Sequence, residues 1–136
     1  FMDDHLAPAG LIAGPKIKSR VEDDLRYGHD IAKEVSRLDI GQTVLVKNGT
    51  VLAVEGFEGT NECIKRGGNM GKGKATVVKV SKPNQDFRFD VPVVGPKTIE
   101  TAGATGILVL AIEAGDDTVI ASSIGAGKPG PKLYTR

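Results

Sequence analysis

The dipeptide Asn48–Gly49 constrains the fold of this chain more than any other feature of the sequence. It separates two segments rich in β-branched and aliphatic residues, 43–47 and 50–55. Asn-Gly is the preferred central pair of a two-residue type I′ turn, because both residues tolerate positive φ. The sequence therefore predicts a β-hairpin centred on this dipeptide.

The apolar residues of the hairpin point to both sides of the predicted sheet. A two-residue loop places Val46 opposite Val51 and Leu45 opposite Leu52. Side chains alternate along a strand, so these two pairs face opposite sides. Since both sides are apolar, we expect other elements to cover both faces of the hairpin.

Helical patterns precede and follow the hairpin. Apolar residues at helical spacing predict a helix over 20–37, opened by a capping box of Ser19 and Glu22. Thr60 is expected to cap a short helix within 59–68 that turns Cys63 inward. Another helix is predicted over 96–104, where Pro96 suits the first turn.

Strand patterns alternate with these helices. Strands are predicted over 76–80, 86–91, 107–113 and 118–121. The alternation predicts an α/β fold, with a mixed sheet, hairpins and flanking helices in a single domain. Residues 1–18 are expected to be a linker, 19–121 the folded domain and 122–136 a flexible basic tail.

The composition narrows the class of protein. A net charge of +1 gives no overall field that would favour nucleic acid as a partner. A single cysteine, Cys63, excludes an internal disulfide, and its sequence context favours a core residue over a nucleophile. His5 and His29 are too few and too far apart to indicate a zinc site. No apolar run is long enough to span a bilayer, so we expect a cytoplasmic protein.

The densest group of polar residues lies in 79–92. On the predicted strand over 86–91, Asp86, Arg88 and Asp90 share one face, while Phe87 and Phe89 share the other. Carboxylates can hold Mg²⁺, and a guanidinium can bind phosphate. However, Asp86 and Asp90 lie about 13 Å apart on a flat strand, so one ion cannot join them unless the strand bends. The same pattern also suits an exposed ladder of ion pairs without a ligand.

Two further segments could approach a ligand. Glu55 and Glu58 stand beside glycines at the end of a predicted strand, where they could bind a ligand or simply be solvated. Residues 95–98 place Lys97 and Thr98 at a predicted helix start, which is an anion site or an ordinary helix terminus.

The glycine-rich stretch 67–74 does not indicate a nucleotide triphosphatase. Residues 68–74 match the beginning of a phosphate-binding loop, but Ala75 stands where Ser or Thr is required. The motif also needs a strand before it and a helix after it, and the predicted order here is the reverse. We therefore expect a mobile surface loop over 67–73.

Two segments together resemble the C-terminal domain of LpxI-type UDP-2,3-diacylglucosamine pyrophosphatases. Residues 51–61, continuing to Arg66, resemble one motif of that family, and residues 79–92, with Gly95 and Thr98, resemble the other. Shorter matches occur over 31–33, 38–41 and 101–115. Residues after about 122 depart from the family's usual ending.

The resemblance implies a magnesium-dependent hydrolase that splits UDP-2,3-diacylglucosamine into UMP and lipid X. It also implies an N-terminal domain that is absent here, a substrate held between two domains, and possible peripheral contact with the inner membrane. A binding domain without catalysis remains the alternative. Carried over by position, the catalytic candidates are Asp90, Asp86 and Glu55, and the Mg²⁺ candidates are Asp86, Asp90 and Glu58. The substrate-binding candidates are Lys79, Lys82, Gln85, Arg88, Lys97, Thr98 and Thr60.

Overall fold

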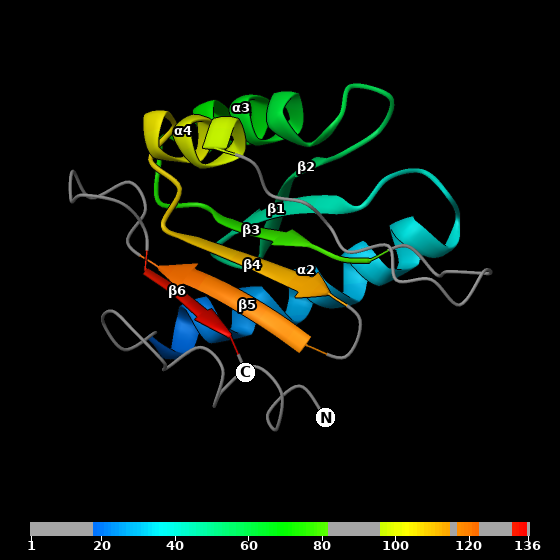
Figure 1. The fold of residues 1–136 in the computed structure, drawn as a ribbon, viewed down its shortest axis with the longest axis horizontal. Coiled ribbons are helices and arrows are strands. Elements are labelled where there is room, and N and C mark those ends of the chain that lie inside the picture. Colours follow the sequence, from blue (N-terminus) through cyan, green and yellow to red (C-terminus); the bar gives the residue numbers. More distant parts are fainter. Residues whose placement is uncertain (1–17, 82–95, 115–116, 123–131, 136) are drawn as a thin grey trace.

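The computed structural model of the chain describes residues 18–81, 96–114, 117–122 and 132–135. A six-stranded sheet forms the middle of the fold (Figure 1), in the order β2-β1-β3-β4-β5-β6. Strands β3 and β4 are parallel, and every other neighbouring pair is antiparallel. The predicted α/β fold with a mixed sheet is therefore confirmed. The strands are β1 (Thr43–Lys47), β2 (Thr50–Val54), β3 (Thr76–Lys79), β4 (Val109–Ala114), β5 (Asp117–Ser122) and β6 (Lys132–Thr135).

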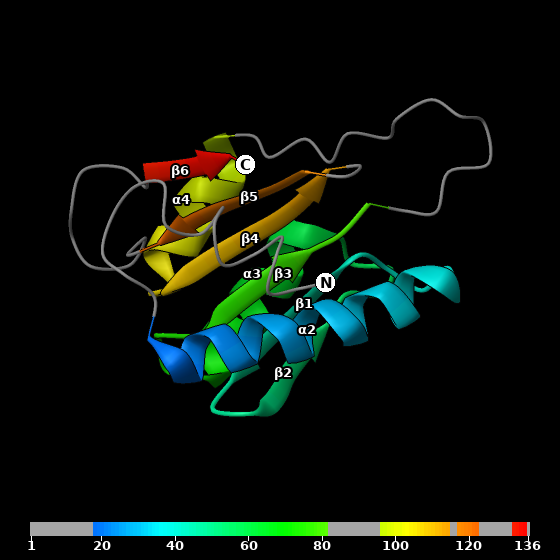
Figure 2. The same ribbon diagram turned by 90° about the horizontal axis from the view of Figure 1, so that it is seen from below.

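Helices cover both faces of this sheet. Helix α2 (Ser19–Arg37) lies on one face, and helices α3 (Thr60–Met70) and α4 (Pro96–Ala104) lie side by side on the other (Figures 1 and 2). The aliphatic residues of β1 alternate between the two cores: Val44 and Val46 contact the α2 side, while Leu45 contacts the α3 side. The hairpin is covered on both faces, as expected from its sequence.

The hairpin turn is built as its dipeptide predicts. Asn48 has φ of 50° and Gly49 has φ of 78°, as a type I′ turn requires. Asp24 of α2 accepts hydrogen bonds from both backbone N–H groups, at 3.0 Å from Asn48 and 2.8 Å from Gly49. This buried carboxylate fastens the turn to the helix, a contact that nothing in the local sequence indicates.

The register of the hairpin differs in one place from the prediction. Val46 pairs with Val51 as expected, but Leu45 pairs with Ala53 instead of Leu52, because a bulge follows the first pair. A bulge inserts one extra residue in a strand. As a result, Leu52 and Ala53 both contact the core beneath α3 and α4.

Two predicted helix starts are wrong in detail. The N-cap of α2 is Lys18, without a side-chain hydrogen bond, so Ser19 and Glu22 form no capping box. Glu22 instead pairs with Arg26 one turn later, at 3.2 Å. The N-cap of α3 is Gly59, and Thr60 is the first helical residue. Thr60 is therefore available to contact the sheet.

The predicted loop over 67–73 is mostly helix. Helix α3 continues to Met70, and Gly67 and Gly68 are buried in it. A Cβ on Gly67 would lie 2.8 Å from Leu45 Cδ2 and 2.9 Å from Ala53 Cβ. Glycine lets the helix approach the sheet this closely, so these residues serve packing and not mobility.

The chain end also contributes to the sheet. Residues 132–135, assigned to the basic tail from the sequence, form β6 and pair with β5. The predicted strand over 86–91 and the linker over 1–17 lie outside the described residues. The proposed boundaries at 18 and 121 stay predictions.

Candidate functional site

Several polar side chains meet where the parallel strands end. Strands β3 and β4 end at the same side of the sheet, and the antiparallel pairing of β1 places the end of β2 there as well. We call this side the carboxyl end of the sheet. In α/β sheets, ligands bind in the crevice outside the carboxyl ends of the strands. Helix α3 also begins on this side, because only the short loop 55–59 separates it from the end of β2.

The starts of α3 and α4 lie together at the carboxyl end. Thr98, in the first turn of α4, donates a hydrogen bond from Oγ1 to Asn61 Oδ1 at 2.6 Å. Further along, a Cβ on Gly68 would lie 2.7 Å from Thr105, so the two helices run in the same direction. The first N–H groups of a helix and its dipole attract anions. Two such helix starts in contact make this position favourable for a phosphate group.

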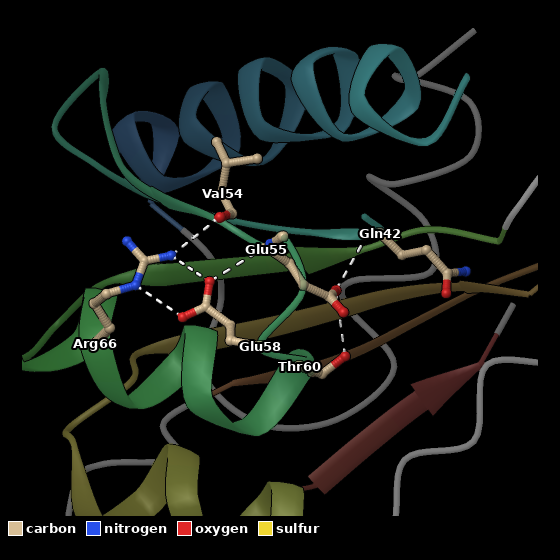
Figure 3. A network of polar contacts seen from close by, with 7 residues as sticks. Gln42, Val54, Glu55, Glu58, Thr60 and Arg66 are labelled. Atoms are coloured by element: carbon tan, nitrogen blue, oxygen red, sulfur yellow. Dashed lines mark hydrogen bonds and ion pairs between the residues drawn. The ribbon is translucent and has the colours of Figure 1, made fainter. Parts of the chain in front are cut away.

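Glu55 is held in place between β1 and α3. Its Oε1 accepts hydrogen bonds from the Gln42 backbone N–H at 3.2 Å and from the Thr60 hydroxyl at 3.5 Å (Figure 3). The Thr60 hydroxyl also lies 3.3 Å from that of Thr43. Among the described residues, Glu55 Oε2 has no hydrogen-bond partner, so it can accept a proton or bind a cation.

Glu58 is paired in a different way. Arg66 of α3 donates to its Oε1 at 2.6 Å and to its Oε2 at 3.0 Å, and also to the Val54 carbonyl at 3.1 Å (Figure 3). The hydrogen bonds from Arg66 hold the pKa of the Glu58 carboxyl below its usual value. A metal ion at Glu58 would have to compete with the guanidinium for the carboxylate, and the predicted role of Glu58 as a Mg²⁺ ligand stays a prediction. The pair instead ties the β2–α3 loop to the helix.

Lys79 occupies the middle of the carboxyl end. It pairs with Thr43 on β1 and Ile112 on β4. Because Val77 faces the α3 core, alternation directs Lys79 to the same face, beside the helix starts. The side chain is half-buried. It forms no ion pair within the described part of the chain, so its ammonium group remains free to neutralise a bound anion.

Of the remaining predicted site residues, the structure describes Lys97 and Thr98. Lys97 is exposed in the first turn of α4, and Thr98 is buried. A hydroxyl has one proton to donate, and Thr98 already donates its own to Asn61. The Thr98 hydroxyl therefore links the first turn of α4 to the first turn of α3. The other predicted residues, Lys82, Gln85, Asp86, Arg88 and Asp90, lie outside the described residues.

Cys63 is a core residue, as its sequence context indicated. Its side chain is completely buried in α3, and burial raises the pKa of the thiol to about 12. Burial therefore strongly disfavours the thiolate, which is the nucleophilic form, at neutral pH.

A second polar cluster, not expected from the sequence, lies on the α2 side of the carboxyl end. Glu113 of β4 contacts His29 Nε2 at 2.7 Å and Lys33 Nζ at 2.8 Å. Burial by itself would raise the pKa of the Glu113 carboxyl, but hydrogen bonds from His29 and Lys33 outweigh it and keep this pKa low. Only the fold brings these residues together, because Glu113 lies 84 positions after His29 and 80 positions after Lys33.

The low pKa of Glu113 predicts a loss of stability in acid. A glutamate whose pKa is lower in the folded state stabilises the fold above its unfolded value of about 4.3, and this contribution disappears as the pH falls through the folded value. We expect Glu113→Gln to reduce the free energy of unfolding at pH 7 more than at pH 3. Urea unfolding at both pH values measures this, with Glu100→Gln on α4 as the control. An equal loss at both pH values would contradict the prediction.

The fold and this arrangement define an α/β domain whose candidate binding side lies at strand ends and helix starts. The chain belongs to the LpxI C-terminal domain family, which matches residues 8–123. A relative from Caulobacter vibrioides (strain ATCC 19089 / CIP 103742 / CB 15), UDP-2,3-diacylglucosamine pyrophosphatase LpxI, is 38% identical over 100 residues. The match covers 68% of this chain and 36% of the relative. The chain thus spans about a third of that relative's length.

In the described segments, no helix combines the length and the apolar character needed to cross a bilayer.

Proposed function

We propose that this chain is the catalytic C-terminal part of a hydrolase that splits the pyrophosphate bond of UDP-2,3-diacylglucosamine. The products would be UMP and 2,3-diacylglucosamine 1-phosphate, in a step of lipid A biosynthesis. Membership in the LpxI C-terminal domain family carries this proposal. The relative named for this activity is 38% identical over the matched region. Because the match covers 36% of the relative, a further domain is proposed to complete the substrate chamber.

The carboxyl end suits a diphosphate. A pyrophosphate carries negative charge that repels a nucleophile, and preorganised positive groups relieve that repulsion. Lys79 and the joined starts of α3 and α4 supply such groups on one face of the sheet. Lys97, exposed on α4, extends the positive region. The predicted contacts from Lys82, Gln85 and Arg88 stay part of this proposal.

Glu55 is our first choice among the described residues for handling the proton of the attacking water. A general base must be ionised and positioned. Oε1 is fixed by the Gln42 N–H and the Thr60 hydroxyl, which leaves Oε2 to face a ligand. Asp86 and Asp90 stay candidates for the same role.

The described residues fit a Mg²⁺ ion only in combination with a substrate. Mg²⁺ is usually bound through one or two carboxylates together with substrate phosphates and water. Within residues 18–81 and 96–113, no three acidic, histidine or cysteine side chains gather as a metal cluster. Glu55 offers one carboxylate, and Asp86 and Asp90 are the proposed additional ligands. A bound Mg²⁺ would neutralise charge on the diphosphate.

Lys79 provides a test of the diphosphate contact. We expect Lys79→Met to raise KM for the sugar nucleotide about 10- to 100-fold, because a hydrogen bond to a charged group contributes about 1.5–3 kcal/mol. Methionine keeps most of the side-chain length and removes the charge. Lys65→Met, on the exposed side of α3, is the matched control. An unchanged KM in Lys79→Met would remove this residue from the site.

Release of UMP tests the activity itself. The chain should replace the matching segment of the Caulobacter vibrioides relative in a chimera, and UMP should be measured with Mg²⁺ present. We expect turnover by the chimera and little by the chain alone. A folded chimera that binds the sugar nucleotide but releases no UMP would contradict the proposal and favour a binding domain without catalysis.

Fractionation of cells would test the proposed cytoplasmic location with peripheral contact to the inner membrane.

A further inference from the structure

Gln42 connects the candidate site to the middle of the sheet through hydrogen bonds in two directions. Its backbone N–H donates to Glu55 Oε1 at 3.2 Å (Figure 3). Its side-chain Nε2 donates to the Val80 carbonyl oxygen at 2.9 Å, and its own carbonyl accepts from the Val80 N–H at 2.9 Å. Both backbone groups of Val80 are therefore bonded to this one residue.

These bonds join two strands that are not neighbours in the sheet. Glu55 directly follows β2 and Val80 directly follows β3, and β1 lies between the two strands. Val80 is also the residue after Lys79. Gln42 therefore ties the candidate proton acceptor, Glu55, to the strand end that carries the candidate anion contact, Lys79.

The side chain of Gln42 replaces a bond that the backbone ordinarily makes. In an antiparallel ladder, every second pair of opposite residues exchanges both of its N–H···O bonds. Val80 donates to the Gln42 carbonyl as such a pair requires, but the return bond to the Val80 carbonyl comes from the Gln42 side chain. The backbone N–H that would make this bond is directed to Glu55 instead.

This substitution keeps the backbone N–H of residue 42 on Glu55. Val80 is completely buried, and a buried carbonyl without a donor is unfavourable. Without the side-chain amide, we expect the N–H of residue 42 to turn back to the Val80 carbonyl. Glu55 Oε1 would then lose its bond at 3.2 Å and keep the longer contact to the Thr60 hydroxyl at 3.5 Å.

We propose that Gln42 is a positioning residue for the hydrolysis and acts through Glu55, an inference that rests on the proposed function. Its side-chain amide binds Val80, and this bond lets its backbone N–H orient the Glu55 carboxylate. Glu55 Oε2 is thereby presented to the attacking water in a fixed place relative to Lys79. Such fixed geometry accelerates a reaction because small displacements of the reacting groups reduce the rate strongly.

Gln42→Met tests this role in the chimera. Methionine has a similar length and shape but no donor for the Val80 carbonyl. We expect kcat for UMP release to fall about 10-fold, in the upper range for one lost hydrogen bond, while KM changes less than about 2-fold. Lys47→Met, at the other end of β1, removes a bond of the same kind from Nζ to the Gly71 carbonyl and is the matched control. It should leave kcat unchanged.

A double-mutant cycle separates positioning from a general loss of structure. If Gln42 acts through Glu55, the kcat effect of Gln42→Met should shrink to less than about 2-fold when Glu55→Gln is already present, because coupled residues are not additive. An unchanged kcat in Gln42→Met, or an equal fall with and without Glu55→Gln, would overturn the positioning role and leave the hydrolase standing.

Amide NMR of the chain alone tests the contact without any turnover. Glu55→Gln should shift the amide resonance of residue 42 in the unmodified chain and have little effect on it when Gln42→Met is present. Absence of UMP release by the unmodified chimera would contradict the hydrolase, whereas this NMR result would still support the control of the Glu55 carboxylate by the Gln42 side chain. Equal shifts with and without Gln42→Met would overturn that control.

Discussion

Replacing Glu55 by glutamine is expected to lower kcat by about 10²- to 10⁴-fold, the usual contribution of a general base. The substitution removes the negative charge and keeps the shape. The amide oxygen of glutamine can still accept the hydrogen bonds from the Gln42 N–H and the Thr60 hydroxyl. The fold should therefore persist while the ability to take a proton or bind a cation is lost.

Steady-state kinetics of UMP release by the chimera, together with circular dichroism, measure this effect. Glu34→Gln on α2 is the control, because that exposed glutamate pairs only with Arg37 on its own helix among the described residues. Glu55→Asp keeps the charge but shortens the side chain, so it should retain more activity than Glu55→Gln. If Glu55→Gln and Glu34→Gln have the same kcat as the unmodified chimera, Glu55 has no catalytic role.

Gly41→Ala is expected to destabilise the fold by about 3 kcal/mol, near the upper end of the usual cost of overpacking. A Cβ at this position would lie 2.1 Å from the Glu55 carbonyl oxygen and 2.8 Å from its carbonyl carbon. Both atoms belong to the backbone, so no side-chain rotation can relieve the clash. The α2–β1 and β2–α3 loops would separate, and the Gln42 contact to Glu55 would be lost with them.

Urea unfolding of the chain measures the change in free energy, and the chimera shows whether activity falls with it. Gly56→Ala is the matched control: it lies in the adjacent loop, nothing is within 4 Å of a Cβ there, and its φ is not positive. We expect this control to be close to neutral. Equal stability of Gly41→Ala and Gly56→Ala would show that the two loops tolerate separation.

The local parts of the fold were predictable because they depend on neighbours in sequence. Asn48–Gly49 predicted its turn, since few residue pairs accept two positive φ values. The bulge at Leu52, opposite Leu45 and Val46, was not predictable, because it depends on how Leu52 and Ala53 meet α3. The glycines at 67 and 68 were misread as a loop for the same reason: a glycine that permits close packing and one that permits a turn look alike in sequence.

The sequence indicated which residue types could form the candidate site, but it did not indicate which side chains would contact one another. Glu55 and Thr98 stood out because a charged or hydroxyl group closed a strand or opened a helix, and Lys79 was carried over from the family resemblance of the polar stretch 79–92. That Thr98 meets Asn61 depends on two helices lying side by side. The sequence also assigned Glu58 the same kind of role as Glu55, because both are glutamates beside glycine.

The sequence by itself determined the α/β class, the hairpin and the family, because these follow from short-range patterns of residue type. Only the tertiary structure decided which glutamate is engaged by Arg66 and which has a carboxylate oxygen without a partner among the described residues. It also decided that Phe57 is exposed beside that oxygen's loop. The physical reason is that burial and hydrogen bonding depend on residues brought together from distant positions, whereas turn and strand preferences act within a few residues.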